Sequence, residues 1–133
     1  GVEVVCTSAT GFRLLDYILN ASRLIVIDTI VSGTAEPGTV CVLREEEIPA
    51  APGGSPHYVG LFDALALGRK LELPVPQEVI ILAVEAADCS TVGSAIHPAV
   101  REAMPVVVNL AQQFLRASRF CSSTRDQGQS EKE

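Results

Sequence analysis

The sequence predicts an α/β fold: a three-layer sandwich in which a mostly parallel, twisted sheet is flanked by helices. Strand-like segments alternate with helix-like segments along the chain, which is the pattern of βαβ units. Residues 24–28 and 79–85 lie in continuous apolar runs, as expected for strands that are covered on both faces. The 133 residues fit a single domain over residues 1–120, followed by polar residues 121–133 that are predicted to be disordered.

The first half of the chain predicts three strands and one helix. Residues 2–5 (VEVV) are mostly β-branched and predict a short strand. Apolar residues at helical spacing predict an amphipathic helix over residues 11–20. Residues 24–28 form the first buried strand. Residues 38–43 alternate in character, which predicts a strand at an edge of the sheet.

The second half predicts a loop, two helices and a strand. Residues 45–56 hold three prolines and two glycines and predict a loop. A helix is expected over residues 59–71, followed by the buried strand at 79–85. Residues 98–117 predict a long amphipathic helix, which Pro105 is expected to kink or split.

The acidic composition argues against one class of partner. The formal net charge is −6, whereas a nucleic-acid surface needs clustered lysine and arginine. We therefore expect no nucleic-acid partner. The chain also has no apolar run near the roughly 20 residues that a membrane-spanning helix requires, so no membrane partner is expected.

The four cysteines are Cys6, Cys41, Cys89 and Cys121. None lies in CxxC spacing, so no zinc knuckle or redox pair is indicated. Cysteines in or beside apolar runs predict buried free thiols, which are typical of a reducing compartment. Because no signal-peptide pattern is present either, the chain is expected in the cytoplasm.

Two buried strands end in a carboxylate: Asp28 closes RLIVID, and Glu85 closes EVIILAVE. In open α/β sheets, ligands bind beside the carboxyl ends of the strands. His57 is one of two histidines and stands between the loop rich in glycine and proline and the next helix. One Asp and one His are a common nucleus for a divalent-metal site. Asp28 and His57 are therefore the candidate metal ligands, with a third ligand expected from elsewhere.

Each of these residues also has a purely structural interpretation. Asp28 could cap the turn after its strand, and His57 could cap the helix that follows it. Glu85 is either a third ligand or an anchor for a loop, and we favour the anchor. His97 precedes Pro98 and is expected to be a helix cap or a surface residue. A P-loop, a GxGxxG motif and a serine nucleophile elbow are absent, which counts against an unrelated α/β protein that binds a nucleotide or flavin.

Five segments of the chain, taken in order, carry a resemblance to one family. They cover most of residues 2–117 and read TGFRLLDYI, ASRLIVIDTIVSGTAEPGTV, SPHYVGLFDALALGRKL, EVIILAVEAAD and HPAVREAMPVVVNLAQQFL. The most specific features are the aspartate that closes RLIVID, the turn region with glycine and proline after it, and the His-x-x-Gly-Leu pattern. In these features the sequence resembles the hydrogenase maturation endopeptidases, which remove the C-terminal extension of the nickel–iron hydrogenase large subunit.

The resemblance implies a function, a partner and a pair of ligands. The chain is expected to be an endopeptidase that cuts the precursor of the nickel–iron hydrogenase large subunit after recognising its bound nickel. The family's metal-binding Asp and His match Asp28 and His57. These two residues would coordinate a divalent metal, the nickel of the substrate, and so position the scissile bond.

The chain departs from the family at its N-terminus. The family's third ligand is an acidic residue in a Gly-Asn-Pro…Gly-Asp-(Asp/Glu)-Gly motif that follows a first strand, and motif and strand are both absent here. A truncated copy of a longer protein and a naturally reduced, inactive relative would each explain this. We favour truncation, because the apolar strands are still suited to burial on both faces. The alternative function is a binding module that recognises the hydrogenase subunit without cutting it.

Overall fold

The computed structural model describes residues 1–50 and 56–117, and for residues 48–50 and 56–59 it describes the backbone only. The tail that the sequence predicts to be disordered, residues 121–133, lies outside the described part. Within the described part, no helix combines the length and the apolar character that crossing a lipid bilayer requires.

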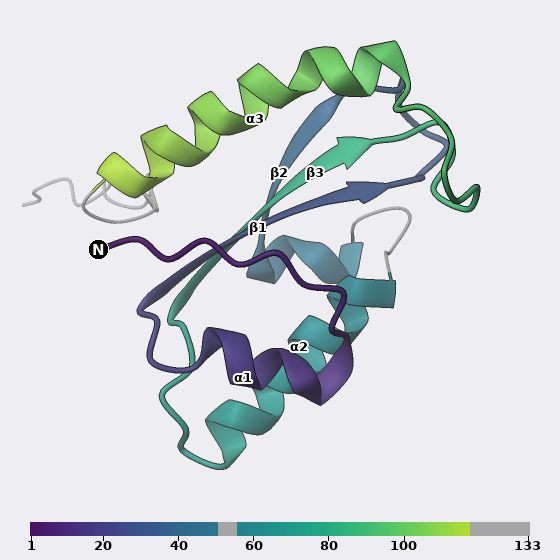
Figure 1. Cartoon of the computed structure of the whole chain (residues 1–133). Coiled ribbons are helices and arrows are strands. Elements are labelled where there is room, and N and C mark those ends of the chain that lie inside the picture. Colours follow the sequence, from purple (N-terminus) through teal and green to yellow (C-terminus); the bar gives the residue numbers. More distant parts are fainter. Residues whose placement is uncertain (51–55, 118–133) are drawn as a thin grey trace, which may run out of the picture.

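The described strands are β1 (Arg23–Ile30), β2 (Val40–Arg44) and β3 (Glu78–Glu85), and they form one sheet in the order β1-β3-β2. β3 pairs in parallel with β1 and antiparallel with β2 (Figure 1). The strands predicted at 24–28, 38–43 and 79–85 are therefore confirmed, with shifts of one or two residues at their ends. β2 lies at an edge of the sheet, as its alternating sequence predicts.

β3 lies at the centre of the sheet because its sequence, EVIILAVE, is apolar on both faces. Ile80, Ile81, Leu82 and Ala83 are completely buried. A strand that pairs on both sides and is covered on both faces loses all contact with water, so only a continuous apolar run is stable there. The central position of β3 is thus a direct consequence of its composition.

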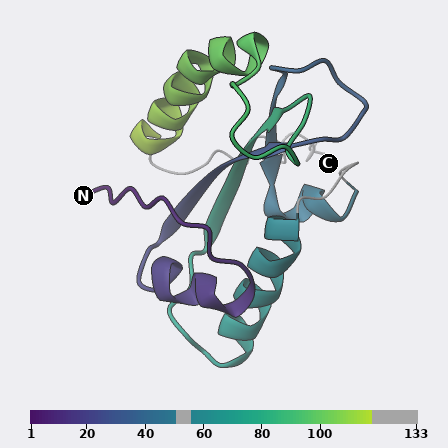
Figure 2. The same cartoon turned by 45° about the vertical axis from the view of Figure 1, so that its right-hand side comes forward.

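Helices cover both faces of this sheet, as the two views in Figure 1 and Figure 2 show. α3 (Pro98–Arg116) lies on one face, where Ala103 and Val107 join the core. α1 (Leu15–Ile18) and α2 (Pro56–Lys70) lie on the other face. The predicted α/β class, a sheet flanked by helices, is confirmed. On the α2 face, one cluster of buried residues consists of Ile18, Leu61, Leu65 and Val79, and a second consists of Ile81 and Ala83.

The helical segment before β1 is shorter than the predicted 11–20. It consists of one 3-10 turn, η1 (Gly11–Leu14), and then α1. Asn20 has a left-handed backbone, with φ of 68°, which is incompatible with a continuing helix. Gly60 in α2 approaches this segment so closely that an added Cβ would lie 2.6 Å from the nitrogen of Gly11. The missing side chain at position 60 therefore allows α2 to pack against η1.

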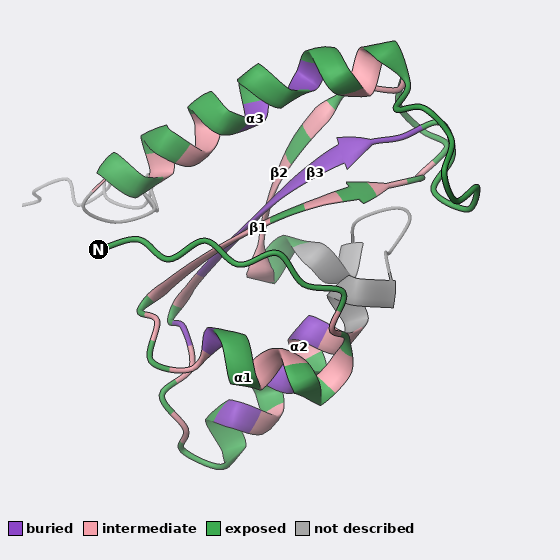
Figure 3. Cartoon of the chain, viewed as in Figure 1, coloured by how far each residue is buried: buried purple, intermediate pink, exposed green. Residues whose placement is uncertain are grey.

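Residues 2–5 belong to no strand, so the predicted first strand is wrong. A strand forms only when a neighbour completes its ladder of hydrogen bonds, and within the described residues no strand pairs with this segment. β1 is likewise the outer strand of the described sheet, and Ile27 is 56% exposed. Burial on both faces is thus correct for β3 and wrong for β1, as the burial colours in Figure 3 show.

The segment after β2 also differs from the prediction. Residues 45–56 were expected to be a loop, but the chain first forms a 3-10 helix, η2 (Glu45–Ala50). The arginine Arg69 of α2 fixes this turn through two hydrogen bonds to the carboxylate of Glu45, at 2.6 and 2.8 Å. Residues 51–55 lie outside the described part.

Pro105 does not split the last helix, which continues from Pro98 to Arg116. A proline in the interior of a helix costs about 3 kcal/mol through a lost hydrogen bond and a steric clash. Here Ala103 and Val107, on either side of it, are both buried against the sheet. This tertiary packing stabilises the helix where its local sequence would break it.

The described cysteines are Cys6, Cys41 and Cys89, and all three are exposed free thiols. The prediction of free thiols is confirmed for them, and the prediction of burial is wrong. Cys41 is the one exposed residue of the edge strand β2, and Cys89 lies in the loop after β3. Cys121 is outside the described residues.

Candidate functional site

β1 and β3 are parallel and therefore end at the same edge of the sheet, where Ile30 stands opposite Glu85. The loops that follow them, residues 31–39 and residues 86–97, both begin at this edge (Figure 1). The first turn of α2 lies nearer to this edge than its last turn in both Figure 1 and Figure 2. These elements form the carboxyl edge of the sheet, which is where α/β folds bind their ligands.

Asp28 lies near the end of β1, on the face of the sheet that α2 covers. Side chains alternate along a strand, and Leu24 and Val26, at the same parity as Asp28, pack into the core beneath α1 and α2. Asp28 stands opposite the fully buried Ala83 and is itself half-buried. Its Oδ1 accepts a hydrogen bond from the backbone N–H of Thr29, at 2.8 Å. A carboxylate is thus held at the carboxyl edge with limited access to water.

His57 is the second residue of α2. Its backbone therefore belongs to the first turn of the helix that covers the face on which Asp28 lies. Its side chain lies outside the described part, so the pairing of Asp28 with His57 stays a prediction. Among the side chains that the structure describes, no three of the types His, Cys, Asp or Glu gather closely enough to hold a metal ion.

Glu85 is a loop anchor, the role that the sequence interpretation favours over metal ligation. It is the last residue of β3 and only 4% exposed. Its carboxylate accepts hydrogen bonds from the backbone N–H groups of Ser32 and Gly33 and from the Ser32 hydroxyl. Because both carboxylate oxygens are engaged by the loop after β1, Glu85 is a structural neighbour of the candidate site.

His97 is a helix cap, as expected. It is the N-cap residue of α3, and its Nδ1 accepts a hydrogen bond from the backbone N–H of Ala99, at 3.2 Å. This contact satisfies one of the N–H groups that the first turn of a helix leaves without an intrahelical partner.

Asp88, in the loop after β3, is a residue that the sequence analysis did not single out. Its Oδ1 accepts hydrogen bonds from the hydroxyl and backbone N–H of Ser90, and its Oδ2 accepts one from the Thr91 hydroxyl. These hydrogen bonds, those from Ser90 foremost, hold the pKa of Asp88 far below its ordinary value. The pattern Asp-x-Ser-Thr is a recognisable signal for such a turn, because Asp side chains often bind the backbone two residues ahead.

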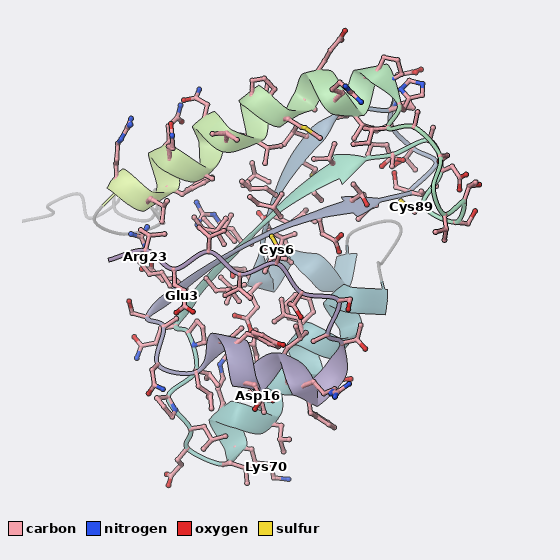
Figure 4. The ribbon with its side chains drawn as sticks, in the orientation of Figure 1. Glu3, Cys6, Asp16, Arg23, Lys70 and Cys89 are labelled. Atoms are coloured by element: carbon pink, nitrogen blue, oxygen red, sulfur yellow. The ribbon has the colours of Figure 1, made fainter. Side chains whose placement is uncertain are left out.

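The same loop also contacts the end of β1. The hydroxyl of Thr29 lies 3.4 Å from Sγ of Cys89, and Figure 4 shows Cys89 on the loop beyond the strand ends. The residue after Asp28 is thereby linked to the loop that follows β3. The carboxyl edge is lined by polar groups from three elements: the end of β1, the loop at 31–39 and the loop at 86–97.

Comparison with known proteins gives one consistent result. A hydrogenase expression/formation protein, HupM of Azotobacter chroococcum, is 31% identical over 134 residues, covering 98% of this chain and 63% of the relative. The hydrogenase 2 maturation protease of Escherichia coli is 41% identical over 70 residues, covering 51% of this chain and 43% of the relative. The chain thus spans less than two thirds of the length of these relatives.

Solved structures agree with the sequence comparisons. The hydrogenase maturating endopeptidase HybD from E. coli superimposes with a TM-score of 0.65 at 29% identity, covering 81% of this chain and 67% of that one. The nickel–iron hydrogenase maturation protease HybD from Thermococcus kodakarensis gives a TM-score of 0.61 at 26% identity, covering 77% of this chain and 72% of that one. A family model described as hydrogenase maturation protease matches residues 1–113. By the fold, by these relatives and by a match over most of its length, the chain belongs to the hydrogenase maturation protease family.

Proposed function

We propose that this chain carries the nickel-recognising part of an endopeptidase that removes the C-terminal extension of a nickel–iron hydrogenase large-subunit precursor. The single observation that carries the proposal is the half-buried carboxylate of Asp28 at the carboxyl edge of the sheet, in a chain of the hydrogenase maturation protease family. The compartment that we propose is the cytoplasm, because the described cysteines are free thiols.

The proposed substrate-recognition step uses two donors. Asp28 supplies a carboxylate oxygen and His57 supplies an imidazole nitrogen, and both donor types suit divalent nickel. The limited exposure of Asp28 strengthens its attraction for a cation, because a partly buried charge is less screened than one in water. With the nickel of the precursor held at this edge, the peptide bond beside it would be presented to the protease in one orientation.

This function has a protonation requirement. Asp28 must be ionised and His57 must be neutral, because a protonated imidazole has no lone pair for a metal. Recognition should therefore weaken as the pH falls below the ordinary His pKa of about 6.5.

The test compares the purified chain with the variants Asp28→Asn and His57→Gln. We expect each substitution to lower the affinity for Ni²⁺, measured by titration calorimetry, by at least about tenfold, since each removes one of few ligands. Asp63→Asn is the matched control, because Asp63 is an exposed carboxylate on α2. Equal Ni²⁺ affinity in all four proteins would refute nickel recognition at this edge.

A second measurement separates the protease from the binding module. The chain is incubated with a nickel-loaded large-subunit precursor, and both co-purification and shortening of the precursor are followed by gel electrophoresis. Cleavage that disappears in Asp28→Asn supports the endopeptidase. Co-purification without cleavage supports the binding module, whose recognition of the subunit should still depend on Asp28 and His57.

A further inference from the structure

The loop after β1 (residues 31–39, the β1–β2 loop) is held by one buried carboxylate. Oε1 of Glu85 accepts hydrogen bonds from the backbone N–H groups of Ser32, at 2.9 Å, and Gly33, at 3.1 Å. Oε2 accepts a hydrogen bond from the Ser32 hydroxyl, at 2.8 Å. Burying a charged group is costly unless it is fully hydrogen-bonded, and the hydrogen bonds that the Glu85 side chain accepts come from two residues of this loop, Ser32 and Gly33.

The backbone of Glu85 holds the other end of the same loop. Its N–H donates to the carbonyl oxygen of Thr39, and its carbonyl oxygen accepts from the N–H of Gly38, both at 2.8 Å. Gly38 has φ of 89°, and an added Cβ would lie 2.5 Å from the carbonyl oxygen of Ala99 at the start of α3. The β1–β2 loop is thus fastened at its beginning and at its end by a single residue.

This fastening acts on the strand that carries Asp28. Ile30 is the last β1 residue in the ladder and stands opposite Glu85, while Asp28 stands opposite Ala83 two positions earlier. Asp28, Ile30 and Glu85 share one face of the sheet by alternation. Among the described strands, β1 pairs only with β3, so its end is held from one side. The hydrogen bonds of Glu85 to Ser32 and Gly33 therefore prevent the end of β1 from fraying back towards Asp28.

We propose that Glu85 is a positioning residue for the candidate nickel-recognition site. It does not touch the metal; it holds the β1–β2 loop and, through it, the end of β1, so that the Asp28 carboxylate meets the substrate's nickel in one place. This inference rests on the proposed function. It explains why a charged residue occupies the buried end of a strand that is otherwise apolar.

Two variants of Glu85 distinguish a positioning role, which depends on its hydrogen bonds, from a role that depends only on its negative charge. Glu85→Gln keeps an oxygen that can accept both backbone N–H bonds, and its amide N–H₂ can donate to the Ser32 hydroxyl. Glu85→Ala removes all three side-chain bonds. Glu102→Ala is the matched control, because Glu102 is an exposed carboxylate on α3.

The first readout is amide hydrogen exchange in the full chain, which does not depend on any metal. We expect Glu85→Ala to speed exchange at Ser32 and Gly33 and at the end of β1, by at least about tenfold. Glu85→Gln and Glu102→Ala should leave these amides as in the wild type. Unchanged exchange in Glu85→Ala would overturn the inference whatever the metal data show.

The second readout is the affinity for Ni²⁺ in titration calorimetry. Removing a group that orients a ligand typically costs between about 10- and 100-fold in metal affinity. We expect a loss in this range for Glu85→Ala, with recovery in Glu85→Gln. Faster exchange combined with wild-type Ni²⁺ affinity would make Glu85 a loop anchor alone and would overturn the positioning role.

Two further measures keep the interpretations apart. If Glu85→Ala fails to fold, Ser32→Ala replaces it. Of the three bonds to the Glu85 carboxylate this variant loses the one from the hydroxyl to Oε2, and it also loses the contacts of that hydroxyl with Thr34, which Thr34→Ala tests separately. A change in both readouts that is smaller than expected for Glu85→Ala and is absent in Thr34→Ala supports the proposal, while no change in Ser32→Ala, or an equal change in Thr34→Ala, overturns it. Failure of the proposed function has a different signature, because then the wild-type chain itself would bind Ni²⁺ no better than Asp28→Asn, and the positioning role would fall with it.

Discussion

Arg23 donates a hydrogen bond from Nη2 to the carbonyl oxygen of Phe114, at 2.6 Å, and so joins the first residue of β1 to the end of α3. A second bond runs from Nη1 to the carbonyl oxygen of Ala117, at 2.8 Å, and Nε binds Glu78 at 3.1 Å. Figure 4 shows Arg23 at this end of the helix. The guanidinium thereby satisfies carbonyl groups that the last turn of a helix leaves without partners.

Arg23→Ala should destabilise the protein by about 2 kcal/mol, since it removes hydrogen bonds from a charged donor and leaves helix carbonyls unpaired. Arg23→Lys should recover little of this, because an ammonium group cannot reproduce the planar fork of donors. Urea denaturation measures the free energy of unfolding. Arg101→Ala, at an exposed position of α3, is the control and should change stability by less than about 0.5 kcal/mol. If Arg23→Ala changed the free energy of unfolding as little as the control does, the hydrogen bonds from Arg23 to the end of α3 would be unimportant for stability.

Gly33 and Gly38 form a matched pair for testing the β1–β2 loop. Both have positive φ, at 71° and 89°, but only Gly38 has a neighbour within reach of an added Cβ. Gly33→Ala should cost about 1 kcal/mol from backbone strain alone. Gly38→Ala should cost at least about 1 kcal/mol more, because its Cβ collides with the backbone of Ala99. Thermal unfolding of the two variants measures this difference. Equal melting temperatures would contradict the close approach of Gly38 to the backbone of Ala99.

The lowered pKa of Asp88 predicts a pH dependence with a definite sign. A carboxylate whose pKa is depressed in the folded state stabilises that state above the unfolded pKa of about 3.9. This contribution is lost as the pH falls from that value through the folded pKa. Carbon-13 NMR of the carboxyl group should show Asp88 still ionised at a pH of about 3.

Two substitutions test the cause of that shift. Ser90→Ala should raise the pKa of Asp88 most, because hydrogen bonds from Ser90 are its largest cause, and Thr91→Val should raise it less. Ser94→Ala is the control, since the Ser94 hydroxyl binds the carbonyl oxygen of Thr91 and not the carboxylate. An ordinary pKa for Asp88 in the unmodified protein would refute the assignment.

The position of each strand in the sheet predicts its hydrogen exchange. β3 pairs on both sides and is buried, whereas β1 pairs, among the described strands, with β3 alone. The amides of Ile80 to Val84 should therefore exchange at least about tenfold more slowly than the slowest amides of β1. Exchange is measured by mass spectrometry or NMR for both strands in the same sample. Slower amide exchange in β1 than in β3 would contradict the described strand order.

The sequence was most informative where one local property was strong. EVIILAVE could only be a strand buried on both faces, and β3 is such a strand. The alternating residues of β2 placed it at an edge. Of the two roles expected for His97, a helix cap or a surface residue, the structure shows the cap. For the site, the carboxylates predicted at the ends of two strands drew attention to the carboxyl edge. β1 continues two residues beyond Asp28, and the favoured anchor role of Glu85 is the one observed. The pairing of Asp28 with His57 stays a prediction.

The failures have a common physical origin in contacts between distant residues. VEVV has the composition of a strand, yet residues 2–5 have no described ladder partner and belong to no strand. RLIVID has the composition of a central strand, yet β1 is an outer strand with Ile27 exposed. Pro105 was expected to kink or split the last helix, and it does not split it, since burial of its neighbours keeps α3 continuous. Local propensity is worth about 1–3 kcal/mol in each case. Tertiary packing outweighs it at Pro105, and at residues 2–5 and in β1 the propensity has no effect without a neighbouring element to pair with or pack against.

The sequence by itself determined the α/β class and the central strand, because hydrophobic periodicity acts over short distances. It also predicted acidic residues at the ends of two strands: Glu85 is the last residue of β3, and Asp28 lies two residues before the end of β1. Only the tertiary structure decided what those residues do. Glu85 binds the β1–β2 loop because the parallel register sets it opposite Ile30, and Asp28 faces α2 because the sheet's alternation and its covering helices fix that side. Register and layer order depend on contacts between residues far apart in the chain, which no local pattern encodes.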